Sequence, residues 1–222
     1  MLIIGLTGSI GMGKSTTSKM FRRLRVPVFD ADATVHALLA PGGRAFRPVI
    51  ERFPEALKDG RIDRVALGAR VFGRKAELRA LERIIHPLVR DEQRRLIATH
   101  ARRRAPMVVL DIPLLFEGGG DAHVDAVLVV SAPNWVQARR VLARPGMTRA
   151  KFRDILSKQV PDAEKRRGAD AVIQTGLGHG HAFRSLKLAL DGFGRHRHRM
   201  WKHHWHRPRI RRPTGPRRRP GG

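Results

Sequence analysis

A glycine-rich motif close to the start of the chain is the feature that most restricts its fold. Residues Gly8–Ser15 read GSIGMGKS and satisfy the pattern G-x-x-x-x-G-K-[ST]. The motif follows Leu2–Leu6, an almost continuous apolar run typical of a strand buried on both faces. It precedes Lys14–Arg25, whose apolar residues fall on one side of a helix. The sequence therefore predicts a strand, a phosphate-binding loop and a helix in direct succession.

The residue types of this motif suit the binding of a nucleoside triphosphate. Glycines let main-chain N–H groups turn inward to phosphate oxygens, and the start of the next helix adds partial positive charge. Lys14 can reach the β- and γ-phosphates, and the Ser15 hydroxyl can bind Mg²⁺. We expect nucleotide contacts from Gly8, Gly11, Met12, Gly13, Lys14, Ser15 and Thr16. The alternative, a glycine-rich turn that fits the pattern by chance, is disfavoured by the strand–loop–helix context.

Further apolar runs alternate with helical stretches along the chain. Five strands are predicted, at residues 2–6, 26–29, 107–110, 126–130 and 171–173. Strands separated by helices pair in parallel with right-handed crossovers, so the pattern predicts an α/β fold with a parallel five-stranded sheet. A final helix is expected at 179–193, with its apolar residues in one stripe.

Two long helical segments interrupt this alternation. Residues 33–105 carry predicted helices at 63–72, 75–85 and 87–104, with Asp63 as an N-cap and Pro87 in the first turn of the last helix. Residues 133–165 are rich in arginine, with helices at 133–144 and 148–159 and Thr148 as a cap. Arg140 and Arg144 are four residues apart, which predicts that both lie on one helix face.

Carboxylates follow two of the predicted strands. Asp32 lies just after the second strand, at the sheet edge where ligands bind in open parallel sheets. It can take a proton from an attacking hydroxyl, or it can simply cap the helix that follows. Asp111 ends the third strand, a position from which a carboxylate can hold Mg²⁺, although strand-terminal aspartates are also ordinary turn residues.

The charge balance is strongly basic, with 45 Lys and Arg against 19 Asp and Glu in 222 residues. Residues 195–222 hold eleven of the basic residues, together with His, Pro and Trp, and read as a disordered tail that can bind polyanions non-specifically. The chain has no cysteine, which excludes disulfides and thiolate metal sites and fits a cytoplasmic protein. No apolar stretch reaches the roughly 18 residues of a membrane span.

Several motifs together resemble the dephospho-coenzyme A kinase family, over most of residues 1–177. The matching residues are the phosphate loop, Asp30-Ala31-Asp32, Gly60–Arg64 with Leu67 and Phe72, Leu81-Glu82, His86-Pro87, Asp111–Glu117, Gln137, Arg140, Arg144, Gln159 and Ala169-Asp170. The Pro-Leu-Leu-Phe-Glu run and the His-Pro pair are characteristic of this family, whereas the phosphate loop is not.

The resemblance implies a three-layer P-loop NTPase fold with a helical acceptor-binding insertion and an arginine-rich lid. It implies transfer of phosphate from ATP, with Mg²⁺, to the ribose 3′-hydroxyl of dephospho-CoA, the last step of CoA synthesis. By position, Asp32 resembles the catalytic base, acting with Lys14 and Arg140, and Arg144 contacts the nucleotide. His86, Leu114 and Leu115 fall in the acceptor pocket together with Asp32.

The chain departs from the family at Gln174-Thr175, where an asparagine near the adenine is usual, and this affects the prediction of nucleotide selectivity. Two other functions are compatible with parts of the sequence. A kinase of the same architecture acting on another hydroxyl or a nucleoside monophosphate would differ only in its acceptor pocket. A nucleic-acid-binding P-loop protein would account for the net charge of +26 but has no use for the Pro-Leu-Leu-Phe-Glu and His-Pro motifs.

Overall fold

The computed structural model describes residues 1–195, so the predicted basic tail falls almost wholly outside the described residues. The chain divides into two compact units. One consists of Met1–Val28 and the chain from Ala105 onward, and the other is Phe29–Arg104. Each unit is built around its own apolar core. Within residues 1–195, no helix is both long and apolar enough to cross a membrane.

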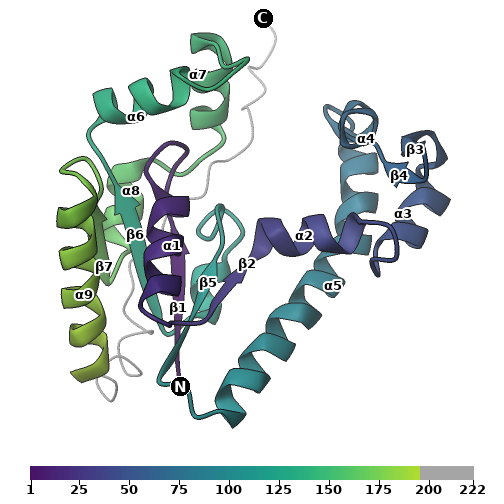
Figure 1. Ribbon diagram of the computed structural model, residues 1–222. Helices are drawn as coiled ribbons and strands as arrows, with labels where there is room; N and C mark the ends of the chain where they lie inside the picture. Colours follow the sequence, from purple (N-terminus) through teal and green to yellow (C-terminus); the bar gives the residue numbers. More distant parts are fainter. Residues whose placement is uncertain (196–222) are drawn as a thin grey trace, which may run out of the picture. The chain divides into compact units, whose positions relative to one another are not determined.

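The first unit is organised by the predicted five-stranded sheet, in the order β2-β5-β1-β6-β7 (Figure 1). The strands are β1 (Leu2–Thr7), β2 (Val28–Asp30), β5 (Met107–Asp111), β6 (Ala126–Ser131) and β7 (Ala171–Gln174). β1 pairs in parallel with β5 and β6, and β6 pairs in parallel with β7. Strand β6 is buried at every position, as expected for an apolar strand in the interior of a parallel sheet. The α/β prediction is confirmed.

Alternate residues of the central strands pack beneath two helices. α1 (Lys14–Arg23) and α9 (His179–Arg195) contact each other and lie on one face of the sheet (Figure 1). Phe21 of α1 and Leu186 of α9 are fully buried in the same core cluster as Ile4 of β1. Gly5 points to the other face, where an added Cβ would lie 2.7 Å from Leu115 Cδ2. Burial on both faces explains why these strands read as continuous apolar runs.

The remaining helices of this unit follow β6. They are α6 (Asn134–Leu142), α7 (Arg149–Ser157) and α8 (Asp162–Arg167), and a short 3-10 turn, η2 (Gly120–His123), precedes β6. Thr148 caps α7 as predicted, since its hydroxyl accepts a hydrogen bond from Lys151 N–H at 3.2 Å. α8, which packs against β6, was not predicted, because six residues are too few to show a helical period.

The second unit is mostly helical. Its elements are α2 (Ala31–Leu39), α3 (Phe46–Arg52), η1 (Pro54–Ala56), β3 (Leu57–Lys58), β4 (Arg61–Ile62), α4 (Arg64–Val71) and α5 (Lys75–Arg102). Asp63 caps α4 as predicted, accepting hydrogen bonds from Val65 and Ala66 N–H. The β3–β4 hairpin was missed. Its signal is the Asp59-Gly60 dipeptide, and both residues adopt the positive φ angles that such tight turns require.

One prediction about this unit is wrong. Residues 75–104 were expected to form two helices, with Pro87 beginning the second, but α5 runs without a break for 28 residues and contains Pro87 (Figure 1). Proline lacks an N–H and so leaves the carbonyl one turn earlier without its usual helical partner. The helix continues because residues on both sides of the proline pack in the same apolar cluster. These residues are Ala80, Leu81 and Ile84 before it and Leu88 and Val89 after it.

Candidate active site

The loop between β1 and α1 needs its glycines. Gly11 and Gly13 have φ angles of +77° and +93°, which side chains rarely adopt. A Cβ on Gly8 would lie 2.7 Å from the carbonyl oxygen of Val130. Gly13 is the N-cap of α1, with no side chain in front of the helix. The first N–H groups of α1 therefore have no helical partner and are free to receive an anion.

Lys14 begins α1 and forms an ion pair with Asp111 at the end of β5. Lys14 Nζ lies 2.6 Å from Asp111 Oδ1, and the Asp111 side chain is 4% exposed. Asp111 is brought there by the sheet, because it pairs in register with Leu6, two residues before Gly8. A buried carboxylate interacts more strongly with a cation than an exposed one does. The structure thus brings together two of the predicted site residues.

Arg140 of α6 is directed to the loop and to the segment after β7. Its guanidinium donates to the Thr175 carbonyl at 2.8 Å, to Thr175 Oγ1 at 3.0 Å and to the Gly11 carbonyl at 3.4 Å. Thr175 Oγ1 in turn donates to the Met12 carbonyl at 2.7 Å. Thr175 therefore ties the phosphate loop to the end of β7. The buried Met12 side chain accepts from Ala132 N–H, so only its main chain is available to a nucleotide.

The prediction that Arg140 and Arg144 share a helix face is wrong. α6 ends at Leu142, and Arg144 lies beyond its C-cap in an exposed turn. The Arg144 N–H donates to the Val141 carbonyl, a hydrogen bond typical of a helix end, and Pro145-Gly146 follows. Arg140 and Arg144 consequently have different surroundings.

Asp32 lies in the second unit, in the first turn of α2, and is exposed. The alternative that Asp32 caps this helix is also wrong. The cap is Asp30, whose Oδ1 accepts from Ala33 N–H at 3.0 Å. Asp32 is therefore not needed to begin the helix, and its carboxylate is open to solvent.

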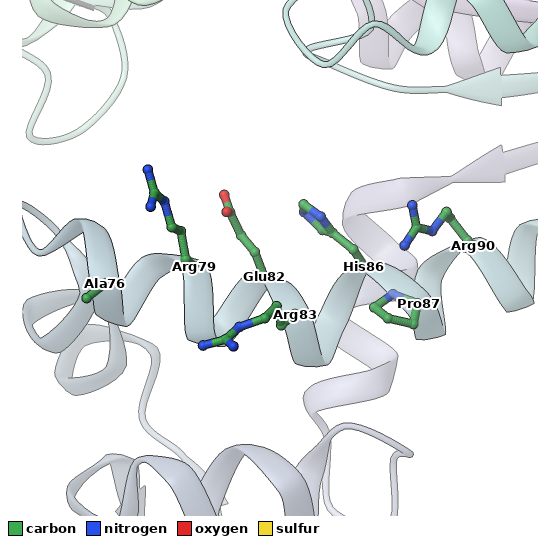
Figure 2. Close-up of a pocket in the computed structure, with 7 residues that line it drawn as sticks. All are labelled: Ala76, Arg79, Glu82, Arg83, His86, Pro87 and Arg90. Atoms are coloured by element: carbon green, nitrogen blue, oxygen red, sulfur yellow. The ribbon is translucent and has the colours of Figure 1, made fainter.

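His86 lies on an exposed groove of about 670 Å³ along α5. Arg79, Glu82, His86 and Arg90 project from the same side of the helix (Figure 2). Arg83 and Pro87 also line the groove. Three arginines and a histidine against one glutamate give this surface a positive charge, which suits a phosphorylated ligand.

Leu114 and Leu115 occupy different environments. Leu115 is fully buried in the first unit and packs against Gly5, which gives it a role in the core. Leu114 is 48% exposed and is the one of the pair that a ligand can contact.

A metal ion would find oxygen donors beside the phosphate loop. The Ser15 hydroxyl is exposed on the first turn of α1, and Asp111 supplies a carboxylate. Hydroxyl and carboxylate oxygens are the donors that Mg²⁺ prefers, and Mg²⁺ is usually held by one or two protein groups together with phosphates. Within residues 1–195 no cluster of three or more His, Asp or Glu side chains could hold a metal by itself. These residues therefore fit a metal that arrives with a nucleotide.

Sequence reasoning gave no reason to expect contacts from Gln137 and Gln159 to the phosphate loop. Gln137 Nε2 donates to the Ile10 carbonyl at 2.8 Å, and Gln159 Oε1 accepts from the Ile10 N–H at 3.1 Å. Both glutamines are far from the loop in sequence, so no local pattern indicates these contacts.

These features define a P-loop nucleotide-binding enzyme. The first strand of a parallel sheet leads into a glycine loop, a lysine and a helix, and the neighbouring strand ends in an aspartate. Comparison with known proteins narrows this class. The dephospho-CoA kinase family model matches residues 2–178, and the chain belongs to this family.

Curated relatives have the name of this family, and a solved structure has a similar fold. The chain is 60% identical to a dephospho-CoA kinase of Paramagnetospirillum magneticum over 166 residues, 75% of this chain and 78% of the relative. It is 54% identical to one of Rhodospirillum rubrum over 191 residues, 85% of this chain and 90% of the relative. A crystal structure of a Thermus thermophilus protein, 38% identical, superposes with a TM-score of 0.75 over 86% of this chain and 96% of that one.

Proposed function

We propose that the protein transfers the γ-phosphoryl group of ATP to the ribose 3′-hydroxyl of dephospho-CoA, giving CoA and ADP, the final step of CoA synthesis. Family membership supports the substrates, and the observation that carries the proposal is the phosphate loop with its Lys14–Asp111 ion pair. The acceptor oxygen forms a bond to the γ-phosphorus, the bond from that phosphorus to the bridging oxygen of ADP breaks, and the hydroxyl proton goes to a base.

Within the first unit, the loop from Gly8 to Gly13 and the first amides of α1 hold the triphosphate. Lys14 stabilises negative charge on the β- and γ-phosphates, and Arg140 adds positive charge near Gly11. Ser15 and Asp111 are the residues that would hold Mg²⁺, which supplies further neutralisation of the phosphate charge when bound. Thr16 and Arg144 are assigned to nucleotide contacts.

In the second unit, Asp32 is the base. It is exposed and is not the cap of α2, so its carboxylate can accept the proton of the 3′-hydroxyl. His86 contributes to acceptor binding on the positively charged groove of α5, and Leu114 of the first unit adds an apolar contact. We assign Phe29–Arg104 to acceptor binding and residues 133–165 to the lid. The absence of cysteine fits a location in the reducing cytoplasm.

An acceptor-specificity assay tests the proposal. With ATP and Mg²⁺, purified protein should form ADP with dephospho-CoA and far more slowly with nucleoside monophosphates or without acceptor. Identification of the product as CoA, phosphorylated at the 3′ position, completes the test. Equal turnover with nucleoside monophosphates would favour a nucleotide kinase of the same architecture.

A second candidate activity rests on the tail, which lies outside the described residues. Eleven Lys and Arg and no acidic residue in residues 195–222 favour non-specific binding of polyanions. Full-length protein should then retard DNA at low salt and release it at high salt, whereas a chain ending at Gly194, which lacks those eleven basic residues, should bind DNA more weakly. Turnover of dephospho-CoA should be nearly the same in both chains, because the matched family region ends at residue 178.

A further inference from the structure

The main chain of Ile10 in the phosphate loop is held by glutamine side chains at both its N–H and its carbonyl. The Ile10 N–H donates to Gln159 Oε1 at 3.1 Å, and the Ile10 carbonyl accepts from Gln137 Nε2 at 2.8 Å. The two glutamines come from opposite ends of the arginine-rich segment 133–165. Gln137 lies in the first turn of α6, and Gln159 lies between α7 and α8. A main-chain N–H can only donate and a carbonyl can only accept, so the orientation of each side-chain amide is fixed by its partner.

Both glutamines are themselves held in place. Gln137 is 4% exposed, and α6 packs so closely on the loop that a Cβ at Gly11 would lie 2.5 Å from Val141 Cγ2. Gln159 precedes Val160, whose N–H donates to Glu117 Oε1 at 2.8 Å. Neither contact therefore comes from a freely rotating surface side chain.

The bonds at Ile10 restrict which amides face a ligand. The Ile10 N–H is already used by Gln159, and the Met12 N–H bonds to the Ser9 carbonyl at 3.1 Å. The N–H groups from Gly13 to Thr16, at the start of α1, remain for phosphate oxygens. The Ile10 carbonyl belongs to the peptide plane that joins Ile10 to Gly11, so rotation of that plane would disturb Gly11, whose positive φ is part of the loop shape.

We propose that Gln137 and Gln159 are positioning residues for phosphoryl transfer. They hold the phosphate loop in its triphosphate-binding shape and couple that shape to the segment 133–165. The inference rests on the proposed function for the identity of the nucleotide, but not on the identity of the acceptor.

The opposite hydrogen-bonding roles of the two side chains provide a matched test. Gln159→Glu keeps an oxygen that accepts from the Ile10 N–H, whereas Gln137→Glu replaces a donor by an acceptor facing the Ile10 carbonyl. Both variants add the same charge beside the main chain of Ile10, but only Gln137→Glu, at the more buried of the two side chains, places an acceptor against a carbonyl. Leu188→Glu, at an exposed position of α9, adds that charge outside the residues assigned to the substrates and should behave as wild type.

The measurements are the dissociation constant for MgATP by titration calorimetry without acceptor, and KM for each substrate. Because an unpaired buried acceptor is costly, Gln137→Glu should weaken ATP binding about tenfold or more, and at least several-fold more than Gln159→Glu. KM for ATP should rise with it, while KM for dephospho-CoA stays constant. A purely structural defect would instead reduce the active fraction and leave both KM values unchanged.

Equal losses in Gln137→Glu and Gln159→Glu, or no loss in either, would overturn the inference. If Gln137→Glu does not fold, Gln137→Met, which has a similar size and no donor, must show the same selective loss of ATP affinity. Wild-type affinity in that variant would also overturn it. Wild-type protein that binds no ATP would instead overturn the proposed function, so the two failures are distinguishable.

Discussion

Lys14 Nζ and Asp111 Oδ1 lie 2.6 Å apart, across the junction between the phosphate loop and the end of β5. The parallel pairing of β1 and β5 places Leu6 opposite Asp111. The glycine-rich loop then leads from β1 to Lys14 at the start of α1. The carboxylate holds the lysine at the phosphate loop. A lysine whose position is already set needs less reorganisation when phosphate charge develops in the transition state.

Replacement of either member of this pair should abolish most of the activity. Asp111→Asn removes the charge that positions Lys14 and is assigned to the metal, so kcat should fall roughly 10²–10³-fold, as when one preorganised electrostatic group is lost. Lys14→Ala should leave no measurable turnover with an intact fold. Steady-state kinetics and circular dichroism measure these effects, with Asp59→Asn in the β3–β4 turn as a control that keeps wild-type kcat. Wild-type turnover in Asp111→Asn would show that the ion pair is only structural.

Asp32 and Asp30 allow a base to be distinguished from a helix cap. Asp32→Asn should lower kcat roughly 10²–10⁴-fold, the range typical of general-base catalysis. Asp30→Asn removes the same charge two residues earlier but keeps a good N-cap side chain on Ala33 N–H, so its effect on kcat should be small. Single-turnover rates with saturating substrates make the comparison. Similar losses in both variants would argue against Asp32 as the base.

His86 is expected to act on the acceptor alone. It is exposed on α5 beside Arg79 and Arg90, and none of these residues belongs to the unit that carries the phosphate loop. His86→Ala should raise KM for dephospho-CoA roughly tenfold, because a hydrogen bond to a charged ligand is lost, while KM for ATP stays the same. His123→Ala, on the exposed turn before β6, is the matched control. A rise in KM for ATP instead would indicate that His86 contributes to nucleotide binding.

The strand–loop–helix start and the five parallel strands could be predicted because they depend on local chemistry and burial. The caps Asp63 and Thr148 were predicted for the same reason, since a cap bonds to N–H groups two or three residues ahead. Capping of α2 by Asp32 was the alternative to a catalytic role, and the structure gives the cap to Asp30. Two aspartates stand in one triplet, and the sequence does not show which of them keeps the extended backbone of an N-cap.

Two of the differences between prediction and structure have a tertiary cause. Pro87 continues α5 because residues on both sides of it pack on one core, which a local rule for proline does not include. The bonds from Gln137 and Gln159 to Ile10 join residues separated by 127 and 149 positions, and no periodicity reports such contacts. The family resemblance picked out both glutamines, but not what they contact.

The ion pair between Arg44 and Asp91 should make the stability of the second unit depend on pH. Arg44 Nη1 lies 2.5 Å from Asp91 Oδ2, and the hydrogen bond from Arg44 lowers the pKa of Asp91 below its ordinary value of 3.8. Arg94 and Arg95 add positive charge on the same side, and Glu92 shares Arg44.

Because the folded-state pKa of Asp91 is depressed, its contribution is complete above pH 3.8 and is lost as the pH falls through the folded value. Arg44→Gln should therefore reduce the free energy of unfolding by a constant amount above about pH 5, and the difference from wild type should shrink at lower pH. Urea unfolding at several pH values, with NMR titration of Asp91, measures both effects. A difference that grows on acidification would contradict this assignment.

The Glu117–Lys165 ion pair joins the end of the segment 133–165 to the loop that follows β5. Lys165 Nζ is completely buried 2.9 Å from Glu117 Oε1, which also accepts from Val160 N–H. Removal of one partner leaves the other charge buried and uncompensated, so Lys165→Met should lower the free energy of unfolding by about 3–5 kcal/mol.

The double variant Glu117→Gln with Lys165→Met should be more stable than Lys165→Met alone. Neither of the two positions then carries a buried charge, and the glutamine oxygen can still accept from Val160 N–H. Urea unfolding of the two single variants and the double variant gives the coupling energy directly. Because Val160 follows Gln159, Lys165→Met should also weaken ATP binding through the loop contact at Ile10, and the double variant should restore part of it. Losses of stability that simply add would mean that the two charges do not interact, and the buried lysine would then need another partner.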